Sequence, residues 1–260
     1  MLHVDNFTYG AVNPALAFII AWLGAFVGLR CASRARAYQG TGRAYWLLLA
    51  AVSIGATGIW VVHFIAMLGF TIPHRPISYS VSITVISMVV TIAIVAAGLL
   101  VAGYRRPSTS KVLIAGVLTG FGVTVMTYAG MAAILVNATM SYDKLRVGES
   151  IIIAMVASTL AFSFALRLRS LVASAGAASI VALGVTGMHY MAMASLRVWP
   201  STSGIVMTGV SGITLLLPII VGITVMSFVL IGHVALAPTE DEIRAERAQL
   251  ARLRATGLQI

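Results

Sequence analysis

The stretch that decides the fold of this 260-residue chain is Gly184-Val-Thr-Gly-Met-His-Tyr-Met-Ala-Met193. Two other stretches align with it without gaps, Gly58-Ile-Trp-Val-Val-His-Phe-Ile-Ala-Met67 and Gly122-Val-Thr-Val-Met-Thr-Tyr-Ala-Gly-Met131. Each has a glycine, four residues, a histidine or threonine, an aromatic residue, any residue, a small residue and a methionine. Their glycines are 64 and then 62 residues apart, and two membrane helices fit into such an interval. The pattern therefore predicts three tandem two-helix repeats.

The composition around these motifs predicts a membrane protein. Hydrophobic residues make up 60% of the chain, charged residues only 9%, and the mean hydropathy is +1.00. A soluble domain has about a quarter charged residues. The net charge of +10 would suggest nucleic acid if the basic residues formed one stripe, but they separate the apolar runs, so we expect no nucleic-acid partner. The single cysteine, Cys31, excludes an intrachain disulfide and a cysteine-rich zinc site.

The apolar runs predict an all-α polytopic protein in contact with the lipid bilayer. Each run is long enough for a span, which needs about 20 residues, and the run 198–212 is predicted to be a loop because it is rich in proline, serine and glycine. Three parallel two-helix repeats and one further helix would form a sensor domain over residues 1–236, leaving 237–260 as a cytoplasmic amphipathic helix or tail. The predicted transmembrane helices are 13–30, 45–70, 80–103, 112–136, 150–168, 173–196 and 213–235.

The distribution of Lys and Arg predicts the orientation. Thirteen of the 17 basic residues fall on the side that holds the C-terminus, and cytoplasmic loops retain such residues. We therefore expect the N-terminus outside and the C-terminus inside a bacterial inner membrane. Residues 1–29 contain no Lys or Arg, whereas a cleaved signal peptide carries positive charge ahead of its apolar segment. The first helix is thus expected to remain as an anchor.

The three motifs are expected to meet at one depth, because each lies on an outward-running helix. Within a motif the polar residue and the methionine are four positions apart and share a helix face. The motif glycines, with Ala66, Gly130 and Ala192, would allow the helices to approach closely. The predicted spans contain no Asp or Glu, which argues against a proton relay and against a Mg²⁺ or Ca²⁺ site. The side chains expected to converge are His63, Met67, Met131, His189 and Met193.

Imidazole and thioether groups together favour Cu(I) over hard cations, and a singly charged ion costs less to hold in an apolar interior than a doubly charged one. Met126 and Met188, which precede the polar residues of the second and third motifs, are further candidate ligands. The alternative for any one methionine is ordinary core packing. For the two histidines the alternative is a hydrogen bond to a neighbouring helix, although ionisable groups within spans are usually functional.

The segment Met188-His189-Tyr190-Met191-Ala192-Met193 resembles the signature of the MHYT family of bacterial membrane sensors. The resemblance covers residues 1 to about 235 and implies a copper site of motif His and Met residues that senses oxygen, carbon monoxide or nitric oxide. From the residues themselves, Phe64, Tyr128 and Tyr190 are expected to form an aromatic belt or to lie behind the ligands, where the tyrosine hydroxyls can orient a ligand imidazole. The chain departs from the family pattern at three positions: Val62 replaces a methionine, Thr127 a histidine and Met191 a threonine.

The resemblance offers a substitute for the missing histidine of the second motif. His3 resembles a histidine that the family often has before its first helix, and it could serve as a ligand in place of Thr127. The family also commonly continues into a diguanylate cyclase, phosphodiesterase, kinase or DNA-binding domain, which this chain lacks. We therefore expect a separate cytoplasmic output protein contacting 237–260, unless the sequence is a fragment of a longer one.

The tail 237–260 has a pattern typical of a helix start. Thr239 and Glu242 form a capping box. Ile243, Leu250 and Leu253 give a sparse apolar stripe, which is consistent with an amphipathic helix or with a homodimer through this segment. A solvated tail is the alternative.

Two further functions remain open beside a non-enzymatic copper sensor. His63 and His189 could ligate one haem in a membrane electron carrier, or the methionines could belong to a copper-handling protein. Catalysis on an organic substrate is not expected, because the sequence has no triad, phosphate loop or paired carboxylates.

Overall fold

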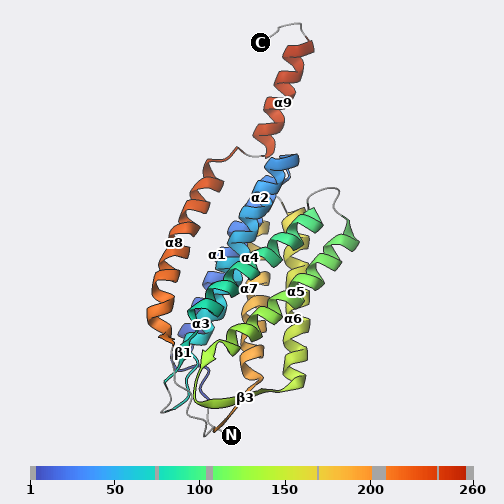
Figure 1. The fold of residues 1–260 in the computed structure, drawn as a ribbon. Coiled ribbons are helices and arrows are strands. Elements are labelled where there is room, and N and C mark those ends of the chain that lie inside the picture. Colours follow the sequence, from blue (N-terminus) through green and yellow to red (C-terminus); the bar gives the residue numbers. More distant parts are fainter. Residues whose placement is uncertain are drawn as a thin grey trace.

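A computed structural model describes residues 4–73, 76–103, 108–168, 170–200, 209–238 and 240–255. Within these residues, seven helical segments are long and apolar enough to cross a membrane (Figure 1). The predicted seven-helix membrane fold is therefore confirmed. The segments are α1 (Val12–Ala35), the continuous helix α2–η1–α3 (Gly40–Leu68), α4 (Val81–Gly103), α5 (Thr109–Ala132), α6 (Lys144–Arg167), α7 (Leu171–Ala194) and α8 (Gly212–Leu236).

The second segment is not a uniform α-helix. It consists of α2 (Gly40–Val52), the π-helical η1 (Ser53–Val61) and α3 (Val62–Leu68). π-Helical turns are rare and occur frequently at functional sites, because the wider turn changes the direction of the side chains that follow. His63 is the second residue after η1, so the side-chain directions of the first motif depend on this wide segment. The sequence pattern did not indicate it.

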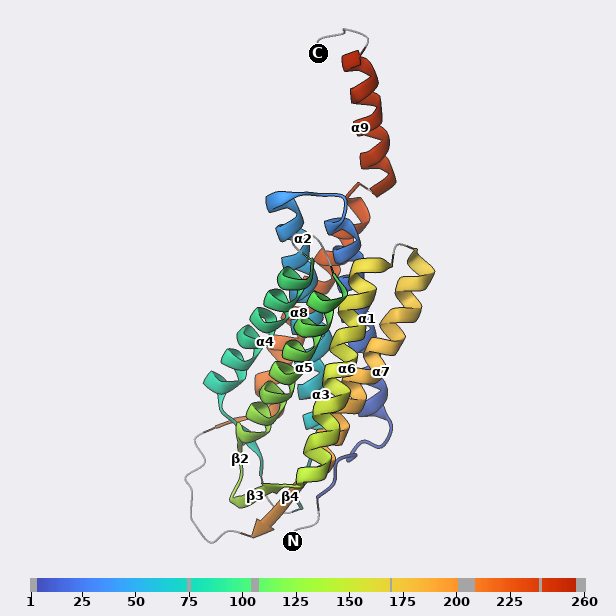
Figure 2. The same cartoon turned by 90° about the vertical axis from the view of Figure 1, so that its right-hand side faces the viewer.

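The first six segments form a closed ring in chain order. Each segment packs against the next, and α7 packs back against α1 (Figures 1 and 2). The motif-bearing helices α2–η1–α3, α5 and α7 therefore alternate around the ring with α1, α4 and α6. This arrangement follows from the repeat of two helices, and it directs one motif from each repeat toward the shared interior.

Glycines allow the closest approaches in this ring, as the sequence predicted. A Cβ atom on Gly24 of α1 would overlap the backbone nitrogen of Gly58 in η1. A Cβ atom on Gly184 of α7 would lie 2.6 Å from the Cβ of Ala157 in α6. Small residues at these crossings bring the backbones together, which favours packing where no hydrophobic effect drives the helices together. The Ser53 hydroxyl adds a 2.9 Å hydrogen bond to the Gly24 carbonyl.

Short antiparallel strands join the segments at the N-terminal end of the bundle, where α3, α5 and α7 finish (Figure 2). β1 (Ser78–Tyr79) lies between β2 (Ile134–Leu135) and β5 (Val210–Ser211). β3 (Ala138–Tyr142) pairs with β4 (Leu196–Pro200). The connections that follow the three motif helices are thereby linked to one another. The prediction of a plain loop over 198–212 was wrong at both ends of that range, because strand partners are not visible in a single segment.

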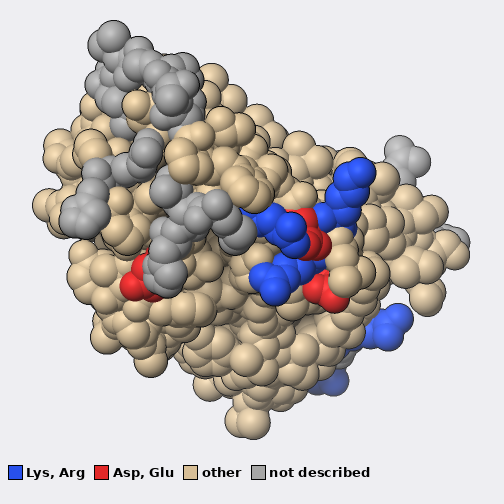
Figure 3. Space-filling view, turned by 90° about the horizontal axis from the view of Figure 1, so that it is seen from below, with Lys and Arg blue, Asp and Glu red and all other residues tan. Residues whose placement is uncertain are grey.

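A small charged group stabilises the same end of the bundle (Figure 3). Asp143 caps α6 by accepting hydrogen bonds from the backbone N–H groups of Leu145 at 3.0 Å and Arg146 at 3.3 Å. Arg197 of β4 forms an ion pair with the Asp143 carboxylate, and the Arg146 guanidinium donates to the Ala194 carbonyl at the end of α7. The Arg146 N–H above all, with the Leu145 N–H and Arg197, holds the pKa of Asp143 below its ordinary value.

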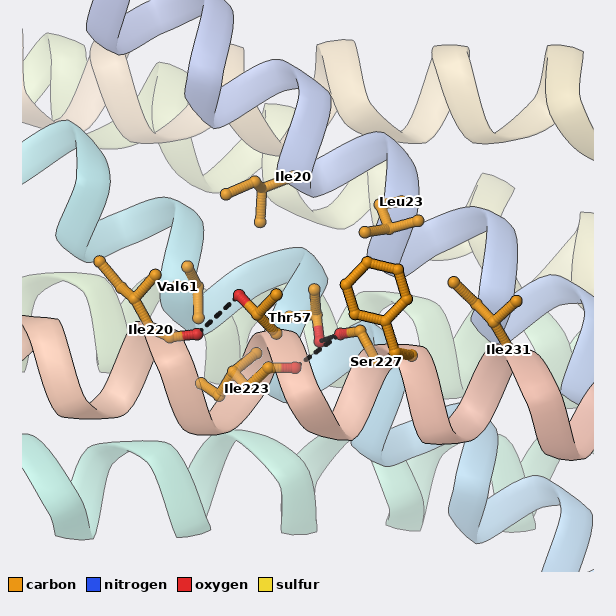
Figure 4. A pocket seen from close by; sticks show the side chains of 10 residues that line it. Ile20, Leu23, Thr57, Val61, Ile220, Ile223, Ser227 and Ile231 are labelled. Carbon is orange, nitrogen blue, oxygen red and sulfur yellow. Dashed lines mark hydrogen bonds between the residues drawn. The ribbon is translucent and has the colours of Figure 1, made fainter.

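The seventh span, α8, lies outside the ring and packs against α1 and η1. A cavity of about 200 Å³ remains between these elements (Figure 4). Across it, the hydroxyl groups of Thr57 in η1 and Ser227 in α8 are 3.2 Å apart.

After α8, the chain forms α9 (Glu240–Ala255), which extends beyond the bundle at the end opposite the N-terminus (Figure 1). The helical alternative for the tail is thus the observed one, whereas the predicted capping residue Thr239 lies outside the described residues.

We predict that Gly24→Ala destabilises the bundle by about 1–3 kcal/mol, the usual cost of overpacking. The added methyl group would meet the rigid backbone of Gly58, which cannot move aside as a flexible side chain can. Reversible unfolding in detergent measures this change. Gly187→Ala on α7 is the matched control, because a Cβ there has no heavy atom within 4 Å. Equal stability of the two variants would contradict the close crossing.

We predict an acid-dependent loss of stability that originates at Asp143. Because its folded-state pKa lies below the ordinary value of 3.8, its contribution is complete above that pH and is lost as the pH falls through the lowered pKa. The thermal midpoint of the wild type should therefore decrease below about pH 4 relative to Asp143→Asn, which keeps an uncharged cap. The difference should shrink at high salt, since the group is partly exposed. Parallel pH profiles of the two proteins would refute this assignment.

Candidate functional site

The two motif histidines meet in the interior of the ring. His63 comes from α3 and His189 from α7, and their side chains are 1% and 0% exposed. Their ring centroids are 5.1 Å apart, with the ring planes tilted by 50°. The repeat therefore brings together two residues that are far apart in the sequence, at the level where the sequence analysis expected them.

Thr127, which replaces the histidine of the second motif, reaches the same place from α5. Its hydroxyl oxygen lies 3.3 Å from Nδ1 of His189 and 3.9 Å from the sulfur of Met188. The hydroxyl is also 3.0 Å from the carbonyl of Val123 on its own helix, and that carbonyl competes with Nδ1 of His189 for its single proton. All three motifs thus contribute their polar residue to one buried cluster, which consists of His63, Thr127, Met188 and His189.

The π-helical segment η1 contributes a backbone group that determines the tautomer of His189. Nε2 of this residue lies 3.3 Å from the carbonyl oxygen of Ile59. A carbonyl only accepts, so Nε2 carries the proton and the lone pair of the neutral ring is on Nδ1. That lone pair faces the Thr127 hydroxyl. A histidine that donates one N–H to a backbone carbonyl and directs its other nitrogen into a site is the usual arrangement of a metal-ligating imidazole.

His63 occupies space that the second motif provides. A Cβ atom on Gly130 would overlap Nε2 of His63, so the small residue of this motif has a defined partner. Nε2 of His63 is buried and has no hydrogen-bond partner among the described residues. A buried polar atom without a partner costs about 1–3 kcal/mol. Such an atom next to a second imidazole is therefore a site at which a bound ion could recover that cost.

The methionines predicted as ligands are all buried, and Met188 is the one with a defined contact to the cluster. Met67, Met131 and Met193 lie one helical turn beyond the polar residue of their motifs and are at most 1% exposed. Met126 is 3% exposed. The remaining predicted ligand, His3, lies outside the described residues.

The donor set of the cluster differs from that of common structural metal sites. Within the described parts of the chain, no group of three or more His, Cys, Asp or Glu side chains is placed to hold an ion. Two imidazoles are adjacent, and the Thr127 hydroxyl contacts both Nδ1 of His189 and the sulfur of Met188. These residues fit a soft, singly charged ion, because every donor is neutral and one is a thioether.

The motif tyrosines do not have the role expected of them. The Tyr128 hydroxyl lies 3.1 Å from the Ser150 hydroxyl and 3.4 Å from that of Ser195, so it links α5 to α6 and α7. The ring of Tyr190 stacks on Phe7 with centroids 5.3 Å apart. The expectation that these hydroxyls orient an imidazole was wrong, because the residue after the histidine position faces a different side of the helix.

We predict that Gly130→Ala displaces the His63 ring and lowers the stability of the protein by about 1–3 kcal/mol. Unfolding in detergent measures the stability, and NMR of histidine labelled with ¹⁵N reports the ring environment. Gly176→Ala on α7 is the control, since a Cβ there contacts nothing within 4 Å. An unchanged His63 signal in Gly130→Ala would show that the ring does not pack against Gly130.

Comparison with known proteins agrees with the repeats that carry the first two motifs. The MHYT family, described as a bacterial signalling protein N-terminal repeat, matches residues 57–115 and 120–178. These two matches begin within the first motif helix and just before the second motif. No solved structure matches the chain.

The chain is also similar to larger bacterial signalling proteins, of which it spans about a quarter of the length. The bifunctional diguanylate cyclase/cyclic di-GMP phosphodiesterase MucR of Pseudomonas aeruginosa is 33% identical over 73% of this chain and 28% of its own length. The cyclic di-GMP phosphodiesterase NbdA of the same organism is 30% identical over 74% of this chain and 25% of its own length. The signalling protein YkoW of Bacillus subtilis is 27% identical over 72% of this chain and 24% of its own length. Together with the repeats and the seven spans, these similarities show that the chain is a multi-pass membrane protein of the MHYT family of bacterial signalling proteins.

Proposed function

We propose that this chain is the sensory module of a signalling system in the bacterial inner membrane, and that His63, His189 and Met188 hold one Cu(I) ion in its interior. The observation that carries the proposal is the pair of adjacent buried imidazoles, in which Nε2 of His63 lacks a partner among the described residues. The sulfur of Met188 is 3.9 Å from the Thr127 hydroxyl, which also contacts His189. Thr127 orients Nδ1 of His189 when the ion is absent. His3, Met67, Met126, Met131 and Met193 are secondary ligand candidates.

The spacing of the rings supports a shared ion. Two imidazoles that bind one ion through metal–nitrogen bonds of about 2 Å at a tetrahedral angle have ring centres about 5 Å apart. The observed centroid distance is 5.1 Å. The spans of the six surrounding helices contain no Asp or Glu except Glu149, which lies in the second turn of α6. Neutral ligands in an apolar interior favour a singly charged ion.

When bound by three protein donors, such an ion keeps an open position that a diatomic gas such as oxygen, carbon monoxide or nitric oxide can occupy. Burial of both rings excludes water from that position. Thr127 is the side chain best placed to contact a gas there, because its hydroxyl already lies between Met188 and His189.

A haem site is less compatible with this geometry. The porphyrin would have to lie between the two rings, but the Ile59 carbonyl, the Thr127 hydroxyl and the Gly130 backbone already lie against them. A copper transport path is also less well supported. Further methionines away from the motifs, Met88, Met155 and Met226, lie singly on α4, α6 and α8.

The signal would leave the site through η1 and α8. Ile59 and Thr57 belong to η1, so a change at His189 acts on the same short segment that contacts α8 through Thr57 and Ser227 (Figure 4). α8 continues into α9, the helix that extends from the bundle. Since MucR and NbdA are named for enzymes of cyclic di-GMP, we propose that α9 contacts a catalytic partner of this class on the cytoplasmic side, in a homodimer.

We predict that protein reconstituted with Cu(I) under reducing conditions binds one copper ion per chain. His63→Ala, His189→Ala and Met188→Leu should each lower the affinity at least about tenfold, which corresponds to the loss of 1.4 kcal/mol. Elemental analysis after removal of free copper measures the content, and the visible spectrum distinguishes colourless Cu(I) from a haem protein with an intense Soret band.

His233→Ala and Met226→Leu are matched controls for this experiment, because both residues lie on α8 outside the ring. They should retain the metal. Full copper content in both His63→Ala and His189→Ala would show that the ion is bound elsewhere, and absence of copper from the wild type would end the proposal.

We further predict that Cu(I) binding moves α8. Spin labels at Leu236→Cys on α8 and Val172→Cys on α7 can report their separation, since these positions are 89% and 82% exposed whereas the native Cys31 is buried. The distance distribution should shift when copper binds, and Thr57→Val should reduce that shift. Thr224→Val is the control, because its hydroxyl donates a hydrogen bond within α8, to the Ile220 carbonyl. An identical shift in both variants would exclude this route.

A further inference from the structure

Trp60 of η1 lies next to the groups that hold both motif histidines. Its ring centroid is 4.6 Å from that of Phe64, and Phe64 in turn makes an edge contact with His63 at 5.1 Å. In the sequence it directly follows Ile59, whose carbonyl oxygen lies 3.3 Å from Nε2 of His189. A single neighbouring residue therefore links this indole to each of the two imidazoles.

The indole is held by α4, a helix that carries no motif. Nε1 of Trp60 donates a 2.9 Å hydrogen bond to the hydroxyl oxygen of Ser87. The Ser87 hydroxyl donates its own proton to the Thr84 carbonyl at 2.7 Å, so its oxygen is left to accept the indole proton. Trp60 is 1% exposed and Ser87 6%. In this apolar interior the indole depends on that acceptor, because an unpaired buried donor is costly.

The backbone of η1 packs closely against the helices on two of its sides. A Cβ atom on Gly55 would lie 3.0 Å from the backbone Cα of Ile92 in α4. On the side of α1, Gly58 faces Gly24. Small residues allow such approaches, but a glycine has no side chain that can fix the rotation of the segment about its axis. Side chains that bond to a neighbouring helix have to supply that constraint.

Three side chains of η1 form such bonds, each to a different helix. Ser53 bonds to α1, Thr57 to α8 and Trp60 to α4. Trp60 is the one adjacent to Ile59 in the sequence, so its bond acts most directly on the direction of the Ile59 carbonyl. The rotation of η1 at the histidine pair is therefore set from α4.

We propose that Trp60, anchored by Ser87, is a positioning residue for the histidine pair. Their hydrogen bond fixes the rotation of η1, which aims the Ile59 carbonyl at His189 and supports the ring of His63. The carbonyl keeps the proton of His189 on Nε2 and leaves Nδ1 directed into the site, the usual orientation of a ligating imidazole. This inference rests on the proposed function in taking the two imidazoles as ligands, whereas the orientation itself needs no ion.

The test is the tautomer of His189 in the copper-free 260-residue chain in detergent, read from NMR of histidine labelled with ¹⁵N and assigned with His189→Ala. The wild type should show one tautomer, with the proton on Nε2. Ser87→Ala and Trp60→Phe each remove the hydrogen bond and should give a mixture of both tautomers. A merely structural loss of stability would leave the tautomer of the folded protein unchanged.

The double variant tests whether Ser87 acts through Trp60. Adding Ser87→Ala to Trp60→Phe should cause no further change of the His189 signals, because both substitutions remove the same bond. If Trp60→Phe does not fold, Ser87→Ala still tests the proposal, since it leaves the indole ring in place.

Two variants serve as matched controls. Trp22→Phe removes another indole bond between helices, which runs from α1 to the Ala175 carbonyl at 3.2 Å on α7, the helix of His189. Ser82→Ala removes a hydroxyl group from an exposed position on α4. Both should keep the wild-type tautomer.

Three results would each overturn the proposal: an unchanged His189 signal in Ser87→Ala, the same change in either control, or a further change in the double variant. Because no copper is present, failure of this test is distinct from failure of copper loading, which tests the proposed function.

Discussion

The constraint on which this structure depends is that polar groups buried among apolar helices are costly unless they are satisfied by one another, by the backbone or by a bound ligand. His63, Thr127 and His189 are each at most 1% exposed, and each belongs to a different repeat. Burying an imidazole or a hydroxyl without a partner costs several times the gain from one hydrogen bond. The repeats therefore have to orient their motifs toward a common interior. Glycines at the helix crossings, such as Gly24 against Gly58, make that convergence sterically possible.

The two ends of the bundle differ in how firmly they are held. At the N-terminal end, short strands and the Asp143–Arg197 ion pair link the connections that follow the three motif helices. This fixes the depth at which the histidines meet. At the other end, α8 lies against the ring with a cavity on each side of Ile231. It is held there by hydrogen bonds of Arg34 to the Val234 carbonyl and between Tyr45 and His233. A rigid site next to a more loosely packed helix is an arrangement suited to passing a small change at the site on to α9.

Much of the fold could be predicted from the sequence, since the repeat of Gly, His or Thr and Met gave the number of spans, the pairing of helices and the meeting of His63 with His189. Three features could not. The π-helical segment depends on packing of η1 against α1, which no local pattern reveals. The strands depend on partners more than 50 residues apart in the sequence. The contact of Met188 with Thr127 depends on helix rotation, so the sequence placed Met188 behind Met67, Met131 and Met193 as a candidate ligand.

The central claim, that two imidazoles and a thioether share one ion, is tested most directly by X-ray absorption at the copper edge of protein loaded with Cu(I). The account predicts a first shell of nitrogen and sulfur with the multiple scattering of two imidazole rings, reduced to one ring in His189→Ala and stripped of sulfur in Met188→Leu. A shell of oxygen and nitrogen alone, or one that both substitutions leave unchanged, would contradict it.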